Sequence, residues 1–225
     1  MNRVGVTSDR FVAVAPDYAV AGLEPVPLPC VRVKPALPGQ IAYARERARH
    51  NDLLIITSPR VVSLLWPSGG LSDAELAVVG PSTARSVERA GGRPVVVGDA
   101  GLARLVDLIA GRIDGRSVMI AHGAGSDPVA MSRLRGIAPQ LEEHPVYTTV
   151  PVAPGPEQVD AVAFASPSAV EGWAQSRGFD DLIVAAIGST TAAAVAHHGD
   201  VHVMATRPSH AALARAIASF MEVNT

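Results

Sequence analysis

Two long segments of this chain repeat one another. Residues 53–112 align with residues 161–220 at a constant offset of 108 positions and without a gap. The identical pairs include Ser58/Ser166, Pro59/Pro167, Gly80/Gly188, Thr83/Thr191, Ala84/Ala192, Val87/Val195, Gly91/Gly199, Val95/Val203, Leu105/Leu213 and Ile109/Ile217. A solenoid repeat has a period of about 20–50 residues, whereas this spacing is that of a domain. The sequence therefore predicts two domains of one architecture.

Each copy of the repeat alternates strand and helix signals. The short apolar runs at 53–57 and 161–165 are typical of strands buried on both faces, and a Ser-Pro pair that favours a helix start follows each run. Gly91 and Gly199 are expected to end helices. Further strands are expected at 76–80, 94–97, 184–188 and 201–205, and further helices at 81–92, 101–112, 189–199 and 209–221. This alternation predicts parallel sheets with right-handed crossovers.

The rest of the chain predicts that one domain is discontinuous. Strand-like segments at 116–123 and 141–152 complete the first copy, but the chain ends at Thr225 before the second copy has equivalents. The segments 2–9 and 23–33 resemble those missing parts. Between them, the segment 11–22 contains Pro16, so we expect a truncated or irregular helix there.

We therefore predict an α/β fold of two Rossmann- or flavodoxin-like parallel-sheet domains joined by a two-stranded hinge, with a cleft between them. The predicted domains are residues 1–32 plus 153–225, and residues 36–149. Proline-rich linkers are expected at about 33–37 and 149–155.

The composition excludes several classes of function. The net charge is −2 and no run of Lys or Arg forms a basic stripe, so we expect no nucleic-acid partner. The single cysteine, Cys30, excludes an internal disulfide framework or a cysteine metal cage, and the histidines do not cluster as ligands. We expect no metal. The N-terminus lacks a signal-peptide pattern and no apolar run is long enough for a membrane span, so we predict a cytoplasmic protein without a membrane partner.

Hydroxyl-rich turns follow the predicted strands at the edge where ligands bind in open parallel sheets. They comprise Thr57-Ser58, Gly80-Pro81-Ser82-Thr83, Ser166-Pro167-Ser168 and Gly188-Ser189-Thr190-Thr191. Each turn offers hydroxyls and backbone N–H groups to an anion, or simply caps a helix. Arg10, Arg60 and Arg207 either meet an anion at a strand end or are solvated. The sequence has neither a G-x-G-x-x-G fingerprint nor a P-loop.

Tyr147 is the candidate for acid chemistry. It lies at the end of a predicted strand, beside a crossing between the domains. Its phenol either donates a proton in the cleft or only packs at an interface. His122 follows another strand and either reaches the cleft or is a solvated turn histidine, and we expect the latter.

Several of these motifs together resemble the uroporphyrinogen-III synthase family. They are "TSPR" (57–60), "VGPSTA" (79–84), "VYTT" (146–149), "FASPSAV" (164–170), "IGSTTAAAV" (187–195) and "ATRPSHAALARAI" (205–217). The resemblance covers most of the chain and implies a cofactor-free lyase of tetrapyrrole biosynthesis. Such an enzyme takes linear hydroxymethylbilane, expels its hydroxyl as water and closes the ring with the last pyrrole inverted, by way of a spiro intermediate.

The resemblance also implies roles for particular residues. Tyr147, the tyrosine of "VYTT", would assist departure of the hydroxyl. The residues expected to bind the substrate are Thr7, Thr57, Ser58, Arg60, Ser82, Thr83, Ser166, Ser168, Ser189, Thr190 and Thr191. We expect a monomer whose partner is hydroxymethylbilane, with transient contact to the bilane-forming enzyme.

Two other functions compete with this interpretation. Two lobes around a hinge also describe a non-catalytic protein that binds or senses a tetrapyrrole or another small anion. A nucleotide-dependent transferase is disfavoured because the chain lacks the phosphate-binding loops.

Overall fold

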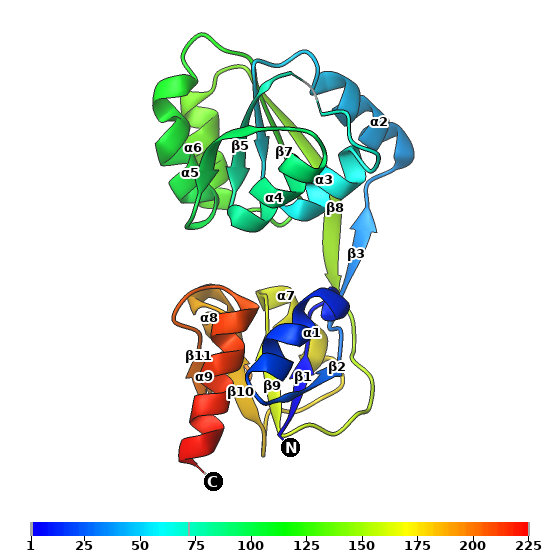
Figure 1. The fold of residues 1–225 in the computed structure, drawn as a ribbon, viewed down its shortest axis with the longest axis vertical. Helices are drawn as coiled ribbons and strands as arrows, with labels where there is room; N and C mark the ends of the chain where they lie inside the picture. The colour runs from blue at the N-terminus through cyan, green and yellow to red at the C-terminus, as the bar shows by residue number, and fades with distance from the viewer. Residues whose placement is uncertain (1, 72, 225) are drawn as a thin grey trace. The chain divides into compact units, whose positions relative to one another are not determined.

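The computed structural model describes residues 2–71 and 73–224 of the chain. These form two compact units, of which unit 1 comprises Met1–Val33 with Val150–Thr225 and unit 2 comprises Lys34–Thr149. Each unit has a largely parallel sheet with helices on both faces (Figure 1), which confirms the predicted α/β class. Within the described residues, no helix combines the length and the apolarity needed to span a membrane.

Unit 1 contains a sheet of parallel strands in the order β11-β10-β9-β1-β2. Its elements are β1 (Arg3–Val6), α1 (Phe11–Val20), β2 (Glu24–Pro27), β9 (Ala161–Phe164), α7 (Pro167–Ala174), β10 (Ile183–Ala186), α8 (Ser189–Val195), β11 (Val203–Met204) and α9 (His210–Val223). When the strands are counted along the unit, this order is 2-1-3-4-5, as in flavodoxin-like folds.

Unit 2 contains a sheet in the order β3-β8-β7-β4-β5-β6. Its elements are β3 (Val31–Pro35), α2 (Pro38–Arg47), β4 (Leu53–Ile56), α3 (Pro59–Leu65), β5 (Glu75–Val79), α4 (Pro81–Arg89), β6 (Pro94–Gly98), α5 (Gly101–Ile109), η1 (Ala110–Arg112), β7 (Val118–Gly123), α6 (Pro128–Ile137) and β8 (Leu141–Pro151). The five strands β4 to β8 pair in parallel.

Five strands of each sheet have the same spatial order, but the chain forms them in a different sequence order in the two units. The offset of 108 residues carries Leu53–Ile56 of β4 onto Ala161–Phe164 of β9, and it carries β5 onto β10 and α5 onto α9. Because β7 and β8 lie beside β4 as β1 and β2 lie beside β9, the order β8-β7-β4-β5-β6 matches β2-β1-β9-β10-β11. The N-terminal strands therefore complete the second copy of the repeat.

The strand residues alternate between two apolar layers in each unit. In unit 2, Leu54 and Ile56 pack with α2, α3 and α4, whereas Leu53 and Ile55 pack with α5 and α6. In unit 1, one face of β9 packs against α1 and α9 and the other face packs against α7 and α8. Burial on both faces explains the continuous apolar runs in the sequence.

The helix ends follow the predicted capping chemistry with one exception. Gly91 has a φ of 89°, the left-handed conformation that ends a helix with glycine. Gly199 is not among the residues with positive φ, so the prediction that it ends a helix in the same way is wrong. A Cβ at Gly199 would lie 3.0 Å from the Cβ of Phe179, and this close approach accounts for the glycine.

The helix at the N-terminus is longer and more regular than its proline suggests. α1 spans Phe11–Val20 with Pro16 inside it. Pro16 cannot donate to the carbonyl of Val12, but Val12 is 89% exposed, so water can take the donor's place. The expectation of a truncated or irregular helix is wrong for this reason.

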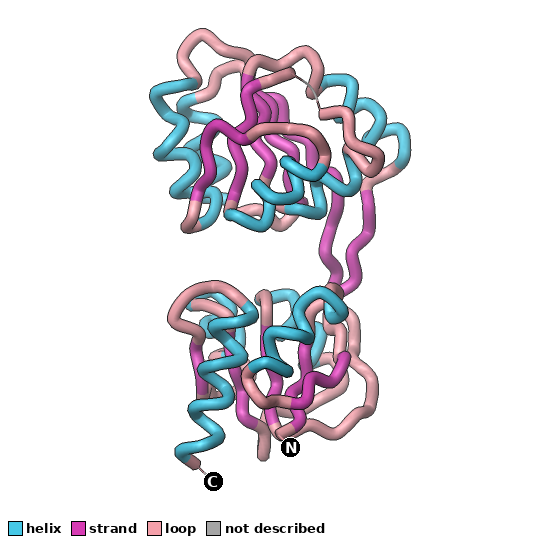
Figure 2. Tube along the Cα trace, viewed as in Figure 1, coloured by secondary structure: helices cyan, strands magenta, loops and turns pink. Residues whose placement is uncertain are grey.

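The chain passes from unit 1 to unit 2 within β3 and returns within β8, and these two strands are neighbours in one sheet (Figure 2). Backbone bonds flank the crossings, because Ala36 N donates to Val146 O at 2.9 Å and Val152 N donates to Cys30 O at 2.9 Å. Both connections are therefore extended strands.

Candidate active site

Tyr147 lies in β8, at an irregularity in the pairing of this strand with β7. His122 pairs with Pro145 but the next residue, Gly123, pairs with Tyr147, so the register shifts by one residue at this point. The Tyr147 ring is partly buried against the apolar layer that includes α3. The phenol is thus held in unit 2 at the carboxyl end of β7, one strand away from β4.

Ser58 is the direct partner of Tyr147. It is the N-cap of α3, and its Oγ accepts from Val61 N at 3.4 Å. The same Oγ lies 3.2 Å from the phenolic oxygen of Tyr147. A hydroxyl has one hydrogen and two lone pairs, so Ser58 can accept at the cap and still donate to Tyr147. In that arrangement the phenolic hydrogen of Tyr147 is left for another acceptor.

A cation lies near the same ring. The guanidinium carbon of Arg60, in the first turn of α3, is 5.2 Å from the centroid of the Tyr147 ring. This distance is within the range of a cation–π interaction. The predicted residues Ser58, Arg60 and Tyr147 are therefore brought together in unit 2.

Thr57 and Thr7 occupy matching strand ends in the two units. The Oγ1 of Thr57, after β4, donates to Ala121 O at 3.4 Å. The Oγ1 of Thr7, after β1, donates to Ala163 O at 2.8 Å, and the Thr7 side chain is buried. In both units, the threonine hydroxyl thus forms a hydrogen bond between the end of one strand and the neighbouring strand.

The remaining predicted residues lie at helix starts. Ser166 caps α7 and accepts from Ala169 N at 3.3 Å, while Ser168 is half-buried in the first turn of the same helix. Thr83 and Thr191 are only 1% exposed, so their side chains point into the units. The exposed hydroxyl residues are Ser82, Ser189 and Thr190.

The starts of α4 and α8 differ from those of α3 and α7. Gly80 and Gly188 are their N-caps, and neither provides a side-chain cap for the first turn. The first turn of each helix is therefore not capped by a side chain of the N-cap residue, and Thr83 N and Thr191 N donate instead to the carbonyls of Gly80 and Gly188 at 3.1 Å.

A family model described as uroporphyrinogen-III synthase HemD matches residues 13–215, which is most of the chain. The chain belongs to the uroporphyrinogen-III synthase HemD family. This confirms the resemblance seen in the sequence and makes the chain an enzyme of tetrapyrrole and haem biosynthesis.

Solved structures of uroporphyrinogen III synthases share the fold. A mutant form of the Thermus thermophilus enzyme is 18% identical, with a TM-score of 0.66 over 99% of this chain and 100% of that one. The Helicobacter pylori enzyme is 14% identical, with a TM-score of 0.68 over 97% of this chain and 100% of that one. A search of curated proteins gave no match.

Gly123 was not predicted from the sequence of this synthase-family chain, and the preferred prediction for its neighbour His122 was a solvated turn. His122 lies inside β7 and is 7% exposed, so the expectation of a solvated turn histidine is wrong. Burial lowers the pKa of His122 below 6.5, which favours the neutral ring. Gly123 packs against the Tyr147 ring. The pairing of β7 with β8 is the signal that brings Gly123 to Tyr147.

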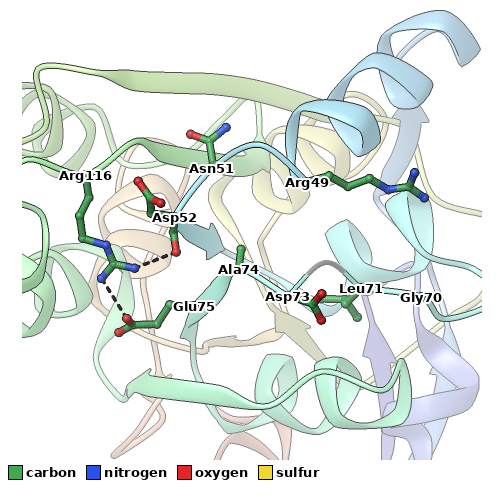
Figure 3. Close-up of a pocket in the computed structure, with 9 residues that line it drawn as sticks. All are labelled: Arg49, Asn51, Asp52, Gly70, Leu71, Asp73, Ala74, Glu75 and Arg116. Atoms are coloured by element: carbon green, nitrogen blue, oxygen red, sulfur yellow. Dashed lines mark hydrogen bonds and ion pairs between the residues drawn. The ribbon is translucent and has the colours of Figure 1, made fainter.

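A pocket of about 850 Å³ in unit 2 lies at the amino ends of the strands, whereas Tyr147 lies at the carboxyl end of β7 (Figure 3). Arg116 Nη1 lies 2.9 Å from Glu75 Oε2 there, and Arg116 Nη2 donates to Asp52 O at 2.7 Å. The lining residues are Arg49, Asn51, Asp52, Gly70, Leu71, Asp73, Ala74, Glu75 and Arg116.

Unit 1 has an equivalent pocket of about 540 Å³, in which Asp160, Leu182 and Ile183 stand 108 positions after Asp52, Ala74 and Glu75. This hollow therefore belongs to the repeated fold, and it lies away from the edge where ligands bind in such sheets. Among the described residues, no group of three or more His, Cys, Asp or Glu side chains could hold a metal ion.

Proposed function

We propose that this chain is a carbon–oxygen lyase that cyclises hydroxymethylbilane to uroporphyrinogen III with loss of water. The observation that carries the proposal is the cluster of Ser58, Arg60 and Tyr147 at the carboxyl end of the unit 2 sheet. The family assignment supports the choice of substrate.

Tyr147 acts as the general acid in this proposal. Its phenolic proton passes to the departing hydroxyl, which leaves as water, while the electron pair of the adjacent pyrrole nitrogen stabilises the methylene carbon that remains. Ser58 donates to the phenolate oxygen and the Arg60 cation offsets its charge. General acid assistance of this kind typically contributes about 10²–10⁴-fold to a rate.

Ring closure balances the reaction. The substituted α-carbon of the last pyrrole attacks the methylene to give the spiro intermediate. The bond from that carbon to its original bridge then breaks, and the bridge bonds to the unsubstituted α-carbon of the same ring, which inverts the ring. The proton that the macrocycle then loses restores the phenol. Since the pyrrole itself supplies the electron pair that expels water, this chemistry requires neither a metal nor a nucleotide.

The substrate carboxylates are assigned to helix starts in the same proposal. The acetates and propionates would accept from the backbone N–H groups and the exposed hydroxyls of Ser82, Ser189 and Thr190. Such sites bind anions without an excess of lysine and arginine, which agrees with a net charge of −2. Thr57 and Thr83 would then support the strand and helix ends of unit 2, and Thr7 and Thr191 those of unit 1.

The cellular setting is the remaining part of the proposal. We assign the chain to the cytoplasm, where a lone thiol such as Cys30 stays reduced, and we propose that it works as a monomer with transient contact to the bilane-forming enzyme. The central experiment supplies hydroxymethylbilane to the purified chain and separates the oxidised product isomers by chromatography. Formation of the type III isomer supports a lyase, whereas type I alone with tight tetrapyrrole binding indicates a sensor.

A further inference from the structure

Gly123 faces Tyr147 across the pairing of β7 with β8. It is the last residue of β7, and the register shift after His122 places it opposite Tyr147. Beyond it, Ala124 N donates to Tyr147 O at 2.8 Å. The backbones of the two segments are therefore fixed to each other at this point.

The phenol of Tyr147 occupies the space that a side chain at position 123 would need. A Cβ built on Gly123 would lie 2.6 Å from Cζ of Tyr147 and 2.8 Å from its hydroxyl oxygen. Carbon atoms in contact are about 3.5–4.0 Å apart, so ring and Cβ cannot coexist in these positions. Gly123 is not among the glycines with positive φ, which means that its backbone conformation would accept alanine.

The backbone at Gly123 is held more firmly than the ring. Its carbonyl oxygen accepts from Ser126 N at 3.0 Å and from Ser126 Oγ at 3.0 Å. His122 Nδ1 lies 2.8 Å from the same oxygen. A carbonyl only accepts, so Nδ1 carries the hydrogen and the buried His122 ring is a third donor. A side chain at 123 would thus displace the phenol rather than the turn.

We propose that Gly123 is a positioning residue for Tyr147. Its lack of a side chain lets the phenol lie where its hydroxyl meets Ser58, and the donors from His122 and Ser126 keep the glycine in place. The inference rests on the proposed function, because it assigns to Gly123 the placement of the catalytic hydroxyl.

Gly123→Ala tests the proposal, with Gly125→Ala as its matched control. Gly125 belongs to the same turn, and a Cβ there has no atom within 4 Å. We expect Gly123→Ala to lower kcat by about 10²-fold, the loss expected for removing the acid, with a smaller change in KM. Gly125→Ala should retain the kcat of the parent. An unchanged kcat in Gly123→Ala would overturn the proposal.

A double-variant cycle separates positioning from general damage. In the Tyr147→Phe background the hydroxyl is already gone, so adding Gly123→Ala should lower kcat no further. If Gly123→Ala lowers kcat by the same factor in both backgrounds, the glycine acts by another route and the inference fails. If Gly123→Ala does not fold, Gly123→Ala/Tyr147→Ala should fold because it removes the clashing ring. Failure of that variant too would also contradict the inference.

Tyrosine NMR tests the placement without relying on activity. With ¹³Cζ-labelled tyrosine, the Tyr147 signal is the one lost in Tyr147→Phe. Gly123→Ala should move this signal and leave those of Tyr18 and Tyr43 in place, whereas Gly125→Ala should move none. An unmoved Tyr147 signal overturns the inference. A moved signal together with an unchanged turnover in Tyr147→Phe would instead show that the proposed acid is wrong while the placement is right.

Discussion

The side-chain oxygens of Ser58 and Tyr147 lie 3.2 Å apart, although 89 residues separate them in the chain. The parallel order β8-β7-β4 brings them together, because Ser58 follows β4 and Tyr147 lies beside the end of β7. A serine that caps a helix thereby also becomes the partner of a phenol.

Replacing Tyr147 by Phe removes the hydroxyl and almost no volume, so the fold should survive. If the phenol protonates the leaving hydroxyl, kcat should fall by about 10²-fold. Tyr43→Phe is the matched control, since Tyr43 lies 60% exposed on α2 of the same unit and should tolerate the change. Steady-state turnover of both variants checks this. A Tyr147→Phe enzyme as fast as the parent would leave Tyr147 with only a packing role.

Ser58→Ala and Ser166→Ala form a pair matched by the repeat. Both serines accept from the backbone N–H three residues on, at 3.4 Å and 3.3 Å, so each alanine should cost about 1 kcal/mol of unfolding free energy. Only Ser58 also contacts Tyr147. We therefore expect Ser58→Ala to lower kcat, and Ser166→Ala to change stability alone. Equal kinetic effects of the two variants would argue against a special role for Ser58.

Much of this fold could be predicted from the sequence because the two copies of the repeat carry the same strand and helix signals at matching positions. The positions of β4 and β9, and the Ser-Pro helix starts after them, follow from apolar runs and capping residues. The role of Gly199 could not be predicted, because a side chain at this position would meet Phe179, which lies twenty positions away in the sequence. Patterns within one segment do not report such contacts.

The site was predictable only in part. The motifs indicated Ser58, Arg60 and Tyr147, and the structure brings them together. The sequence does not show which residues of a helix start face the core. Thr83 and Thr191 were therefore predicted to bind substrate together with exposed hydroxyl residues, although both are buried. Whether these residues contribute to substrate binding remains a prediction.

Glu142 should make the stability of the chain sensitive to acid. Its carboxylate accepts from both Nε and Nη2 of Arg47, and this pairing lowers the pKa of Glu142 from 4.5 to about 2. A lowered pKa stabilises the folded state above pH 4.5, and this contribution is lost as the pH falls from 4.5 towards 2. Denaturant unfolding should therefore show Glu142→Gln less stable than the parent at neutral pH, with the difference shrinking in acid. A difference independent of pH would contradict the assignment.

His122 should make the unfolding free energy depend on pH in a different range. Its Nε2 is buried without a hydrogen-bond partner among the described residues, and burial lowers the pKa of the ring below 6.5. As the pH falls below 6.5, the unfolded chain takes up a proton that the folded His122 does not, so the unfolding free energy should decrease. His122→Gln should flatten this slope.

Comparing His122→Gln with the parent isolates the contribution of His122 to the pH dependence of the unfolding free energy. Burial also lowers the pKa of His210, but that residue is unchanged in both proteins. Parallel pH profiles for the parent and His122→Gln, measured by denaturant unfolding, would show that His122 titrates normally.

The most direct test of the account is the isomer composition of the product formed from fresh hydroxymethylbilane. Without protein, the bilane closes without inversion to the type I isomer. Steering to type III requires a protein that holds the last ring beside the departing hydroxyl, which is a positioning effect. The purified chain, with chelator present and no nucleotide added, should give type III in an amount that rises with protein concentration until type I disappears. Type I alone, formed at the rate seen without protein, would contradict the proposed activity.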